Sequence, residues 1–557
     1  MELSHLIVDA VWRPSFLLKY HELQDHLQPT SGRVGPPSWD SSFLNPRNRV
    51  DNLDITSSRW RIDGATICEY PAALRQGLDA CIGVPLRDGN AISQLGLAKH
   101  LCRALDHHCA QNPGFLQEYS KLPFGSRLIF EDVTPDVADM KLYVERDYGI
   151  ETNMKTLQYL QQSWPDIAQD AWPPAVDLNE LRLVKQLNEA VMLVDFSGQS
   201  LVIFKCASDS LHHTYHELRF LLTCPPHPHI MPRPLAVVLK KSAFGGRSGV
   251  VGFLLQYFKG GSLRDILPAR QRSATLSDTV KLRWCRQVAS ALTHLHDMGT
   301  FYSDLRPDNV LLDSEENAVL CDFEQRGNWY EWSPPEVLYR QYAENIRARL
   351  PSRVVNSPYD HLLKEYARSH SLSTSACYTP AESPIEARNR AWFALPPSAR
   401  EKATVYNFGL FIYCVFEGLS NVQRNVANQF PIEPEVEYPT FRRTPEALRE
   451  IIQRSIGNTL GWGTSELQSR SSRVVRVNGL LYPETRTDLE PDTRQTFDVV
   501  MDTLLEFWST ELMRAERFLE SADWSAGDFG KDRASLRDVV DALESQSEDL
   551  YRRSNIK

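Results

Sequence analysis

Apolar and polar positions alternate along the chain from residue 181 onward, and this alternation predicts a run of β-strands. Three runs are rich in long and β-branched apolar residues: Leu181 to Leu187, Ala190 to Phe196 and Ser200 to Ala207. Apolar residues at helical spacing follow over Leu211 to Leu222. Two more strand-like runs cover Leu235 to Lys240 and Gly252 to Tyr257. This order predicts a small β-rich unit over residues 175–258, with one helix after its third strand.

The remainder of the chain, residues 259–557, predicts mainly helices. Thr279 to Met298 is amphipathic and is followed by Gly299, a residue typical of helix C-caps. Glu401 to Leu419 is apolar on most sides, which is the pattern of a buried helix. Two stretches rich in Ser, Pro, Arg and Asn, residues 341–398 and about 456–490, have the composition of insertions.

The first 170 residues combine helical and strand-like patterns. Helical spacing covers Gln94 to Ala110 and Met154 to Ser163, and a strand-like run covers Ser126 to Glu131. Asp170 to Pro174 ends in two adjacent prolines, which exclude helix and favour extended chain. We therefore expect an N-terminal α/β extension over residues 1–170, followed by a linker.

Composition and charge limit the possible functions. The 557 residues are 42% hydrophobic and 24% charged, which is ordinary globular usage, and the formal net charge is −10. That charge disfavours a broadly basic DNA-binding protein. The ten cysteines include no C-x-x-C pair, and no apolar stretch reaches the roughly 20 residues needed to cross a bilayer. We expect reduced thiols, no membrane partner and a cytoplasmic location.

The strongest chemical signal lies in two short segments, Tyr302 to Asn309 and Cys321 to Glu324. Asp304 is followed five residues later by Asn309 and eighteen residues later by Asp322. Carboxylate and amide oxygens are the ligands that Mg²⁺ prefers, and an aspartate within hydrogen-bond reach can orient a nucleophile's proton. These three side chains can converge on one catalytic site.

The two segments resemble the catalytic loop and the metal-binding loop of protein kinases, whose patterns are H-R-D-L-K-P-x-N and D-F-G. The resemblance covers roughly residues 180–550 and implies an α+β, two-lobed, kinase-like fold. It also implies that ATP and Mg²⁺ are cofactors, that Asp304 orients the acceptor hydroxyl, and that Asn309 and Asp322 bind the metal. Arg306 takes the place of the catalytic-loop lysine and keeps its positive charge.

The resemblance implies further residues that bind the cofactor. Lys205 ends the third strand and resembles the lysine of V-A-I-K, which neutralises nucleotide phosphates. Glu217, on the following helix, would pair with it. Gln256 and Tyr257 precede Gly260, where the segment that follows the hinge begins, and they are implied as cofactor-binding residues.

Other implied residues are structural. Glu336, in Ser333-Pro334-Pro335-Glu336, resembles the glutamate of A-P-E, and Arg533 matches its arginine partner near the final helix. This predicts a buried ion pair between positions nearly 200 residues apart. Tyr302, Phe323 and Leu221 are expected to stack as an apolar spine.

Several positions depart from the kinase pattern. Residues 188–190 contain no glycine where the phosphate loop is expected, and Glu189 brings a negative charge. Tyr302 replaces the histidine of H-R-D, and Glu324 replaces the glycine of D-F-G. Thr404 replaces the aspartate of the central helix, which removes an anchor for the catalytic-loop backbone.

Two further departures belong together. Ser303 replaces the arginine that would clamp a phosphorylated activation loop, and Glu336 comes only 14 positions after Asp322. So short a segment leaves little to phosphorylate. We therefore expect a site fixed in one state, with a reduced platform for peptide substrates.

Three functions follow from these patterns. The first is ATP- and Mg²⁺-dependent phosphoryl transfer to a small-molecule or protein acceptor. The second draws on the segment from Asp322 to Trp329, which resembles degenerate kinase-like chains of fungi and is similar to the arginine-containing cyclodipeptide synthases. There, charged tRNA would be the partner, and Asp304, Asp322 and Glu324 would bind a guanidinium or act as general base. The third is a pseudokinase without catalysis.

Overall fold

The computed structural model describes most of the chain from residue 103 to 327, with short gaps at 120, 125, 132–135, 147, 188–189, 197–199, 207–210 and 244. It also describes residues 332–338, 389–422 except 394, 440–457 and 530–555 except 531, together with short pieces at 60–62, 426–427, 474–477, 480–483, 499 and 503. Most of the two expected insertions lie outside these residues. The helix expected over Gln94 to Ala110 is described only from residue 103, and there residues 103–111 are helical. No described helix combines the length and the apolar character that crossing a membrane requires.

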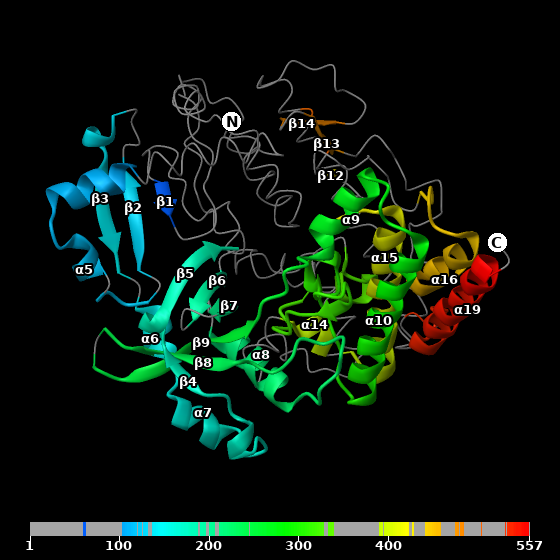
Figure 1. The fold of residues 1–557 in the computed structure, drawn as a ribbon, viewed down its shortest axis with the longest axis horizontal. Helices are drawn as coiled ribbons and strands as arrows, with labels where there is room; N and C mark the ends of the chain where they lie inside the picture. The colour runs from blue at the N-terminus through cyan, green and yellow to red at the C-terminus, as the bar shows by residue number, and fades with distance from the viewer. Residues whose placement is uncertain are drawn as a thin grey trace, which may run out of the picture. The chain divides into compact units, whose positions relative to one another are not determined.

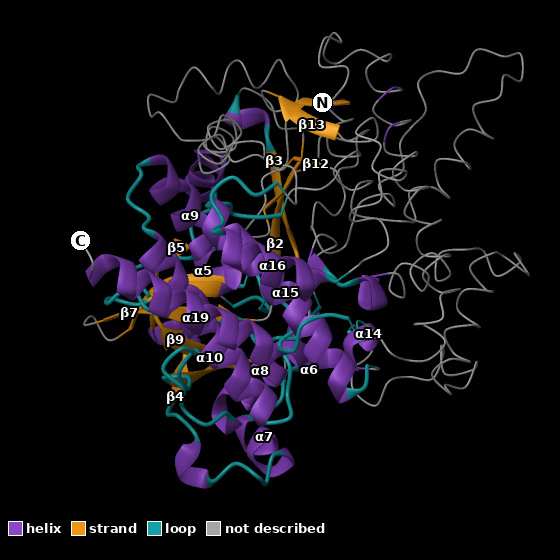
Figure 2. Ribbon diagram, turned by 90° about the vertical axis from the view of Figure 1, so that its right-hand side faces the viewer, coloured by secondary structure: helices purple, strands orange, loops and turns teal. Residues whose placement is uncertain are grey.

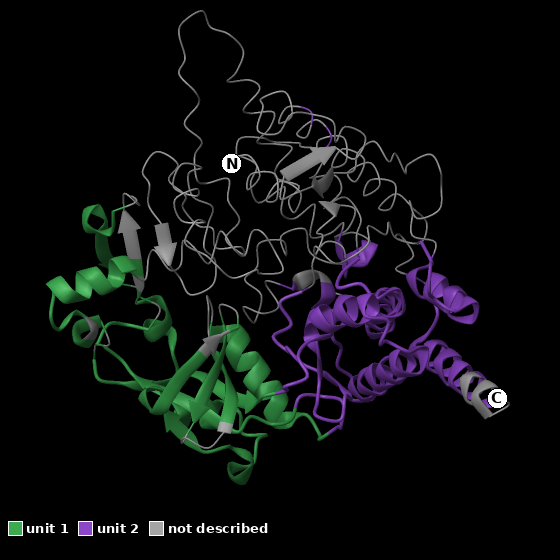
Figure 3. Cartoon of the chain, turned by 45° about the horizontal axis from the view of Figure 1, so that its top comes forward, with its two compact units in different colours: residues 1–9, 31–226, 232–257 green, residues 10–30, 227–231, 258–557 purple. Residues whose placement is uncertain are grey.

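The described residues form two compact units (Figure 3). Of the described residues, unit 1 holds 60–62, 103–226 and 232–257, and unit 2 holds 227–231 and those from 258 onward. The chain passes from one to the other between Tyr257 and Phe258.

A six-stranded sheet is the centre of unit 1 (Figure 1). Its strand order is β4-β8-β9-β7-β6-β5, and helix α8 (Leu211–Thr223) follows β7 in the sequence. Five strands were predicted from the alternating pattern, and all five are present: β5 (Leu181–Gln186), β6 (Val191–Phe196), β7 (Ser200–Cys206), β8 (Ala236–Lys241) and β9 (Ser248–Gln256). Seven successive residues of β9 are buried, which fits a strand that lies between two neighbours with both faces covered.

Strand β4 (Ala175–Asp177) was not predicted. It pairs in parallel with β8, and the N–H of Val237 donates to the carbonyl of Pro174 at 2.9 Å. The stretch expected to be a linker therefore leads directly into the sheet, and Trp172 within it stacks on Trp164 with ring centroids 5.6 Å apart. The described residues of the N-terminal extension and the sheet are parts of one unit.

The N-terminal part of unit 1 contains a three-stranded sheet and short helices. Its strands are ordered β1-β2-β3, and short helices precede the second strand and follow the third in the sequence. A buried carboxylate ties this part to the larger sheet, because Glu151 accepts from Lys240 Nζ at 2.5 Å and from the N–H groups of Phe124 and Ala243 at 2.8 and 2.7 Å. The elements are β1 (Trp60–Ile62), α5 (Phe115–Tyr119), β2 (Arg127–Glu131), η2 (Val137–Asp139), β3 (Lys141–Glu145), α6 (Gly149–Asn153), α7 (Leu157–Ser163), η3 (Gln169–Ala171) and η4 (Leu178–Glu180).

Unit 2 is mainly helical (Figure 2). Helix α10 (Asp278–Asp297) is N-capped by Ser277, and Gly299, just beyond its C-cap, has φ +71° as expected for the residue that ends a helix. Helix α15 (Pro397–Glu417) is buried at every position from 403 to 417, so it forms the core. Other helices are α9 (Leu263–Arg272), α14 (Arg390–Phe393), α16 (Glu446–Ile456) and α19 (Leu536–Asn555).

The short strands of unit 2 include the hairpin that carries the chemical motifs. Strand β10 (Val310–Leu312) pairs antiparallel with β11 (Ala318–Leu320), and the 3-10 helix η5 (Pro307–Asn309) leads into it. The remaining strands form a separate three-stranded sheet: β12 (Val426–Ala427), β13 (Val474–Val477) and β14 (Leu480–Pro483).

Candidate functional site in unit 2 and an ion pair in unit 1

The β10–β11 hairpin brings the two predicted metal ligands to the same end. Val310 lies opposite Leu320, so Asn309 and Asp322 flank the open end of the hairpin. The N–H of Cys321 donates to the carbonyl of Asn309 at 2.9 Å, which continues the pairing by one residue. Their proximity is a direct result of strand register.

Asp304 lies beside Asn309. The amide Nδ2 of Asn309 donates to the carbonyl of Asp304 at 2.8 Å and to its carboxylate Oδ2 at 3.0 Å. Because Nδ2 is used in this way, the oxygen Oδ1 is the atom of Asn309 that a cation would take. Asp304, Asn309 and Asp322 therefore belong to one constellation, as predicted.

Burial and charge set the electrostatics of Asp304. Burial raises the pKa of its carboxyl to about 7, the neighbouring guanidinium of Arg306 opposes that shift, and the nearby Asp322 adds to it. Arg306 Nε lies 3.1 Å from Asp304 Oδ1, and its Nη1 lies 3.6 Å from Asp308. The arginine that takes the place of the catalytic-loop lysine thus contacts the Asp304 carboxylate. A carboxyl that titrates near neutral pH can accept a proton from a hydroxyl group.

The segment after β11 is held against the catalytic loop. Asp322 has a left-handed backbone, with φ +64°, which redirects the chain as it leaves the strand. Tyr302 donates from its hydroxyl to the carbonyl of Cys321, and its ring lies 5.1 Å from that of Phe323 between centroids. Both rings are buried, so two members of the expected apolar spine are in contact. The third, Leu221, is a buried residue of unit 1.

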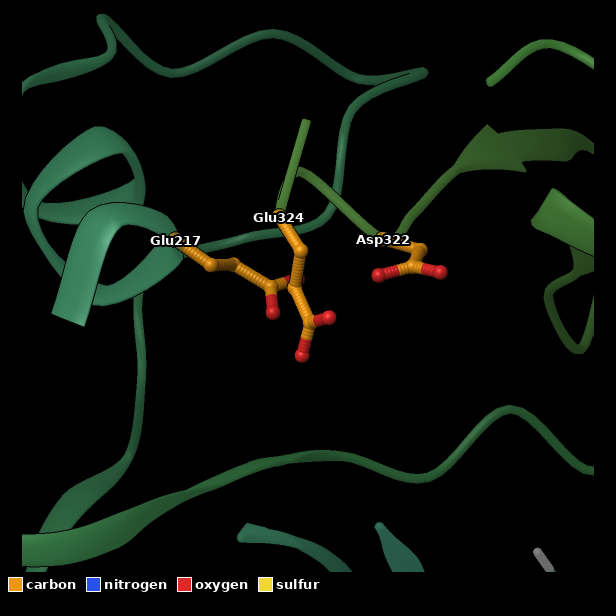
Figure 4. A group of neighbouring side chains, drawn as sticks. All are labelled: Glu217, Asp322 and Glu324. Carbon is orange, nitrogen blue, oxygen red and sulfur yellow. The ribbon is translucent and has the colours of Figure 1, made fainter. Parts of the chain in front are cut away.

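Glu324 lies two residues beyond Asp322, and both carboxylates extend to the same side of the segment that joins them (Figure 4). Glu324 is 7% exposed and forms an ion pair with Arg326. The carboxylate that replaces the glycine of D-F-G is thus already paired with a guanidinium of this chain.

The predicted ion pair between Lys205 and Glu217 is present in unit 1. Lys205 Nζ lies 2.5 Å from Glu217 Oε2, and the two side chains are 8% and 1% exposed. Lys205 lies on β7 and Glu217 lies on α8. The Glu217 side chain is also drawn in Figure 4. Gly252 of β9 makes room for this strand, since a Cβ there would lie 2.2 Å from the carbonyl oxygen of Lys205.

Two other regions of unit 1 were expected to contact a nucleotide. Gln256 is the exposed last residue of β9, and Tyr257, half-buried, precedes the boundary of the unit. Strands β5 and β6 are separated by four residues, and the N–H of Leu187 donates to the carbonyl of Val191 at 2.9 Å. Two of the three residues expected to form the phosphate loop, 188 and 189, lie outside the described residues.

The predicted structural ion pair between Glu336 and Arg533 is present in unit 2. Arg533 donates to both carboxylate oxygens of Glu336, at 2.6 and 2.9 Å, and the side chains are 5% and 0% exposed. Such bidentate geometry is the strongest form of an arginine–carboxylate contact. If either Arg533 or Glu336 were removed, the other would remain as a buried, unpaired charge, so the two residues stabilise the fold only as a pair.

A polar network beside the catalytic loop was not predicted. Gln325 accepts with Oε1 from the N–H and hydroxyl of Ser303, at 3.1 and 2.7 Å, and donates from Nε2 to the carbonyl of Phe301. Asn389 donates from Nδ2 to Ser303 Oγ at 3.1 Å and to the carbonyl of Gln325 at 2.9 Å. Its only signal in the sequence was Ser303 in place of an arginine, because neutral amides carry no pattern that marks their partners.

Comparisons with known proteins agree with this geometry. The family model for the protein kinase domain matches residues 202–342, about a quarter of the chain. Serine/threonine-protein kinase UCN of Arabidopsis thaliana is 29% identical over 143 residues, covering 24% of this chain and 34% of that protein. Protein kinase C epsilon type of Oryctolagus cuniculus is 29% identical over 158 residues, covering 26% and 20%. CBL-interacting protein kinase 10 of Oryza sativa subsp. japonica is 25% identical over 205 residues, covering 36% and 35%.

These alignments span about a fifth to a third of the relatives' own lengths. The matched segment runs from β7 through both motif segments, and it supports a place in the protein kinase-like superfamily for this part of the chain. The fold is accordingly mixed α and β and kinase-like, with one unit built on a mainly antiparallel sheet and one built on helices.

Proposed function

We propose that this chain is a kinase-like phosphotransferase that uses ATP and Mg²⁺. Asp304 orients the acceptor hydroxyl, Asn309 and Asp322 hold the metal, Arg306 stabilises charge near the transferring group, and Lys205, held by Glu217, binds the phosphates. The observation that carries the proposal is the hydrogen-bonded arrangement of Asn309 and Asp304 at the hairpin end that also carries Asp322.

The oxygen set of unit 2 fits Mg²⁺. A hard divalent cation takes carboxylate and amide oxygens, and Asp322 and Asn309 provide one of each. When bound, the ion would neutralise charge on the β- and γ-phosphates. The protein's own contribution is positional, because Asn309 fixes the Asp304 carboxylate through Nδ2 and Arg306 contacts the opposite oxygen.

The Lys205–Glu217 ion pair of unit 1 supplies a positive charge, the Lys205 ammonium, for the negative phosphates. Glu217 holds the Lys205 ammonium at 2.5 Å in a nearly solvent-free position, so the lysine is oriented before a ligand arrives. The proposed reaction requires this ammonium to meet the same nucleotide as Asp322. Since residues 188–190 have no glycine, we expect Lys205 to provide a larger share of phosphate binding than backbone N–H groups do.

No observation favours the tRNA-dependent alternative. The relatives described above are protein kinases, and Glu324, a carboxylate that this alternative would use for a substrate guanidinium, is paired with Arg326. A pseudokinase shares the fold and differs in chemistry, so it is one of the outcomes of the test.

The test begins with nucleotide binding, followed by thermal unfolding with and without Mg²⁺. Mg-ATP at about 100 times its dissociation constant is expected to add roughly 2.7 kcal/mol to stability. ADP formation and transfer of labelled γ-phosphate to protein or to small hydroxyl compounds are then measured in separate arms. Absence of stabilisation would contradict nucleotide use, whereas stabilisation without ADP or transfer would identify a pseudokinase.

Matched variants separate the metal site from general effects of charge. Asp322→Asn is expected to abolish the Mg²⁺-dependent part of the stabilisation and the ADP formation. Asp313→Asn removes the same charge from the closed end of the same hairpin, where Asp313 accepts from the N–H groups of Glu315 and Asn317 at 2.8 Å. This control should retain the response to Mg-ATP.

A further inference from the structure

The network around Ser303 is unusual because all its side chains are neutral and nearly inaccessible. Ser303 and Asn389 are 0% exposed and Gln325 is 6% exposed. Five hydrogen bonds join these three residues to one another and to the carbonyl of Phe301. Buried polar groups are stable only when they are hydrogen-bonded, so the network fixes the relative positions of its members.

Gln325 takes over a contact that the central helix does not make. The sequence replaces the aspartate of that helix by Thr404, and the Thr404 hydroxyl donates within its own helix, to the carbonyl of Arg400 at 2.9 Å. Gln325 instead accepts from the N–H of Ser303 and donates to the carbonyl of Phe301. Gln325 therefore holds the backbone at Ser303, directly before Asp304, and at Phe301.

Helix α14 holds the same loop through aromatic contacts. The ring of Trp392 is parallel to that of Phe301, with centroids 5.6 Å apart, and Phe393 meets Phe301 edge to face at 5.4 Å. The guanidinium of Arg400 lies 5.1 Å from the centre of the Phe301 ring. Asn389 directly precedes this helix, so one short segment contributes both the amide and the aromatic contacts.

We propose that Gln325 and Asn389 are positioning residues that keep Asp304 in its working geometry without any phosphorylated residue. This inference rests on the proposed phosphotransfer, and it adds a mode of regulation. In the kinase pattern, the residue at position 303 is an arginine that responds to a phosphate, and here it is a serine bonded only to neutral amides. The site is consequently always assembled, and its rate is independent of the phosphorylation state of the chain.

The experiment combines amide hydrogen exchange with steady-state kinetics on the full chain. Gln325→Ala removes the acceptor of the Ser303 N–H, so exchange of the peptide containing Ser303 is expected to accelerate about tenfold. The same variant is expected to lose up to about 100-fold in kcat through misplacement of Asp304, with little change in KM for ATP. Asn389→Ala should change both quantities in the same direction and by less, since it removes two of the five hydrogen bonds.

Thr444→Ala is the matched control. Thr444 is a buried residue of unit 2 whose hydroxyl donates to Glu417 at 2.6 Å, so the variant also loses a buried hydrogen bond but leaves the catalytic loop intact. It should alter stability without altering kcat or the exchange of Ser303. Phosphatase treatment of the wild-type chain should leave the rate unchanged.

Three results would overturn the inference: unchanged Ser303 exchange in Gln325→Ala, equal effects in Thr444→Ala, or loss of rate after phosphatase treatment. If the wild-type chain transfers no phosphoryl group, the proposed function fails by itself. The exchange measurement then still decides whether Gln325 and Asn389 position the loop.

Discussion

The Lys205–Glu217 ion pair of unit 1 and the catalytic constellation of unit 2 differ in the surrounding residues that hold them in place. In unit 1, Lys205 and Glu217 retain the charge pattern expected of a kinase, although the expected phosphate loop has no glycine. In unit 2, Asp304, Asn309 and Asp322 also retain their pattern, but the contacts around them are new, with Gln325 and Asn389 in place of charged partners. In unit 2 the groups proposed to touch the substrate are kept and the groups that hold the loop vary, whereas in unit 1 the holding residue Glu217 is kept and the glycines of the phosphate loop are missing.

The two ion pairs show the same contrast. Lys205 meets Glu217 through its ammonium group, whereas Arg533 uses two parallel donors on Glu336. A point charge suits a phosphate-binding role, and a planar fork suits a structural one. This difference in geometry separates a proposed functional pair from a structural pair of similar burial.

The largest expected effect comes from Asp304→Asn in unit 2. Loss of the proton acceptor should lower kcat by about 10²–10⁴-fold with nucleotide binding retained. Because the folded-state pKa of Asp304 is raised to about 7, the folded chain keeps a proton that the unfolded chain releases near pH 4. In metal-free buffer the wild-type unfolding free energy should therefore fall as pH rises from 4 to 7, and the variant should lack this component. Phosphoryl transfer by Asp304→Asn at the wild-type rate would remove Asp304 from the mechanism.

Lys205→Met tests the pair in unit 1. It leaves Glu217 buried without its cation, which should cost about 3–5 kcal/mol of stability and abolish stabilisation by Mg-ATP. The double variant Lys205→Met with Glu217→Leu should recover most of the stability without recovering nucleotide binding. Differential scanning calorimetry and nucleotide titration measure the two effects. Recovery of binding in the double variant would show that the ammonium has no role in it.

His216 on α8 gives unit 1 a pH dependence opposite in sign to that of Asp304. Burial, with a smaller contribution from Arg219, lowers the pKa of His216 to about 4. As pH falls from 6.5 to 4 the unfolded chain gains a proton that the folded chain does not, and stability falls by about 1.4 kcal/mol per pKa unit, ~3 kcal/mol in all. His216→Gln should remove this loss, as measured by urea unfolding across that range. Identical pH profiles for wild type and variant would contradict the assignment.

The smallest effect compares two glycines. Gly252→Ala in unit 1 brings a Cβ within 2.2 Å of the Lys205 carbonyl oxygen, and Gly409→Ala in unit 2 brings one within 2.7 Å of Ser455 Cβ. Each should cost about 1–3 kcal/mol through overpacking. Only Gly252→Ala should also weaken Mg-ATP binding, because it displaces the strand that carries Lys205. Equal nucleotide affinity in the two variants would separate Gly252 from the proposed site.

Residue patterns predicted the strands, the central helix and both ion pairs because each leaves a local signal. Alternating apolar residues marked β5 to β9, and Lys205, Glu217, Glu336 and Arg533 each stand in a recognisable motif. Strand β4 was missed because three residues after two prolines show no periodicity, and its partner β8 lies about 60 residues away. Gln325 and Asn389 were missed because the roles of neutral amides depend wholly on tertiary contacts.

Unit 2 contains a feature with a practical consequence for the stretch between residues 338 and 389. Buried contacts bracket it on both sides, with the Glu336–Arg533 pair just before and the Asn389 amide just after. A fluorescent probe attached beside Asn389 would be joined through that amide to Ser303, the residue before Asp304, which makes this end of the stretch a suitable position for a reporter of the catalytic loop.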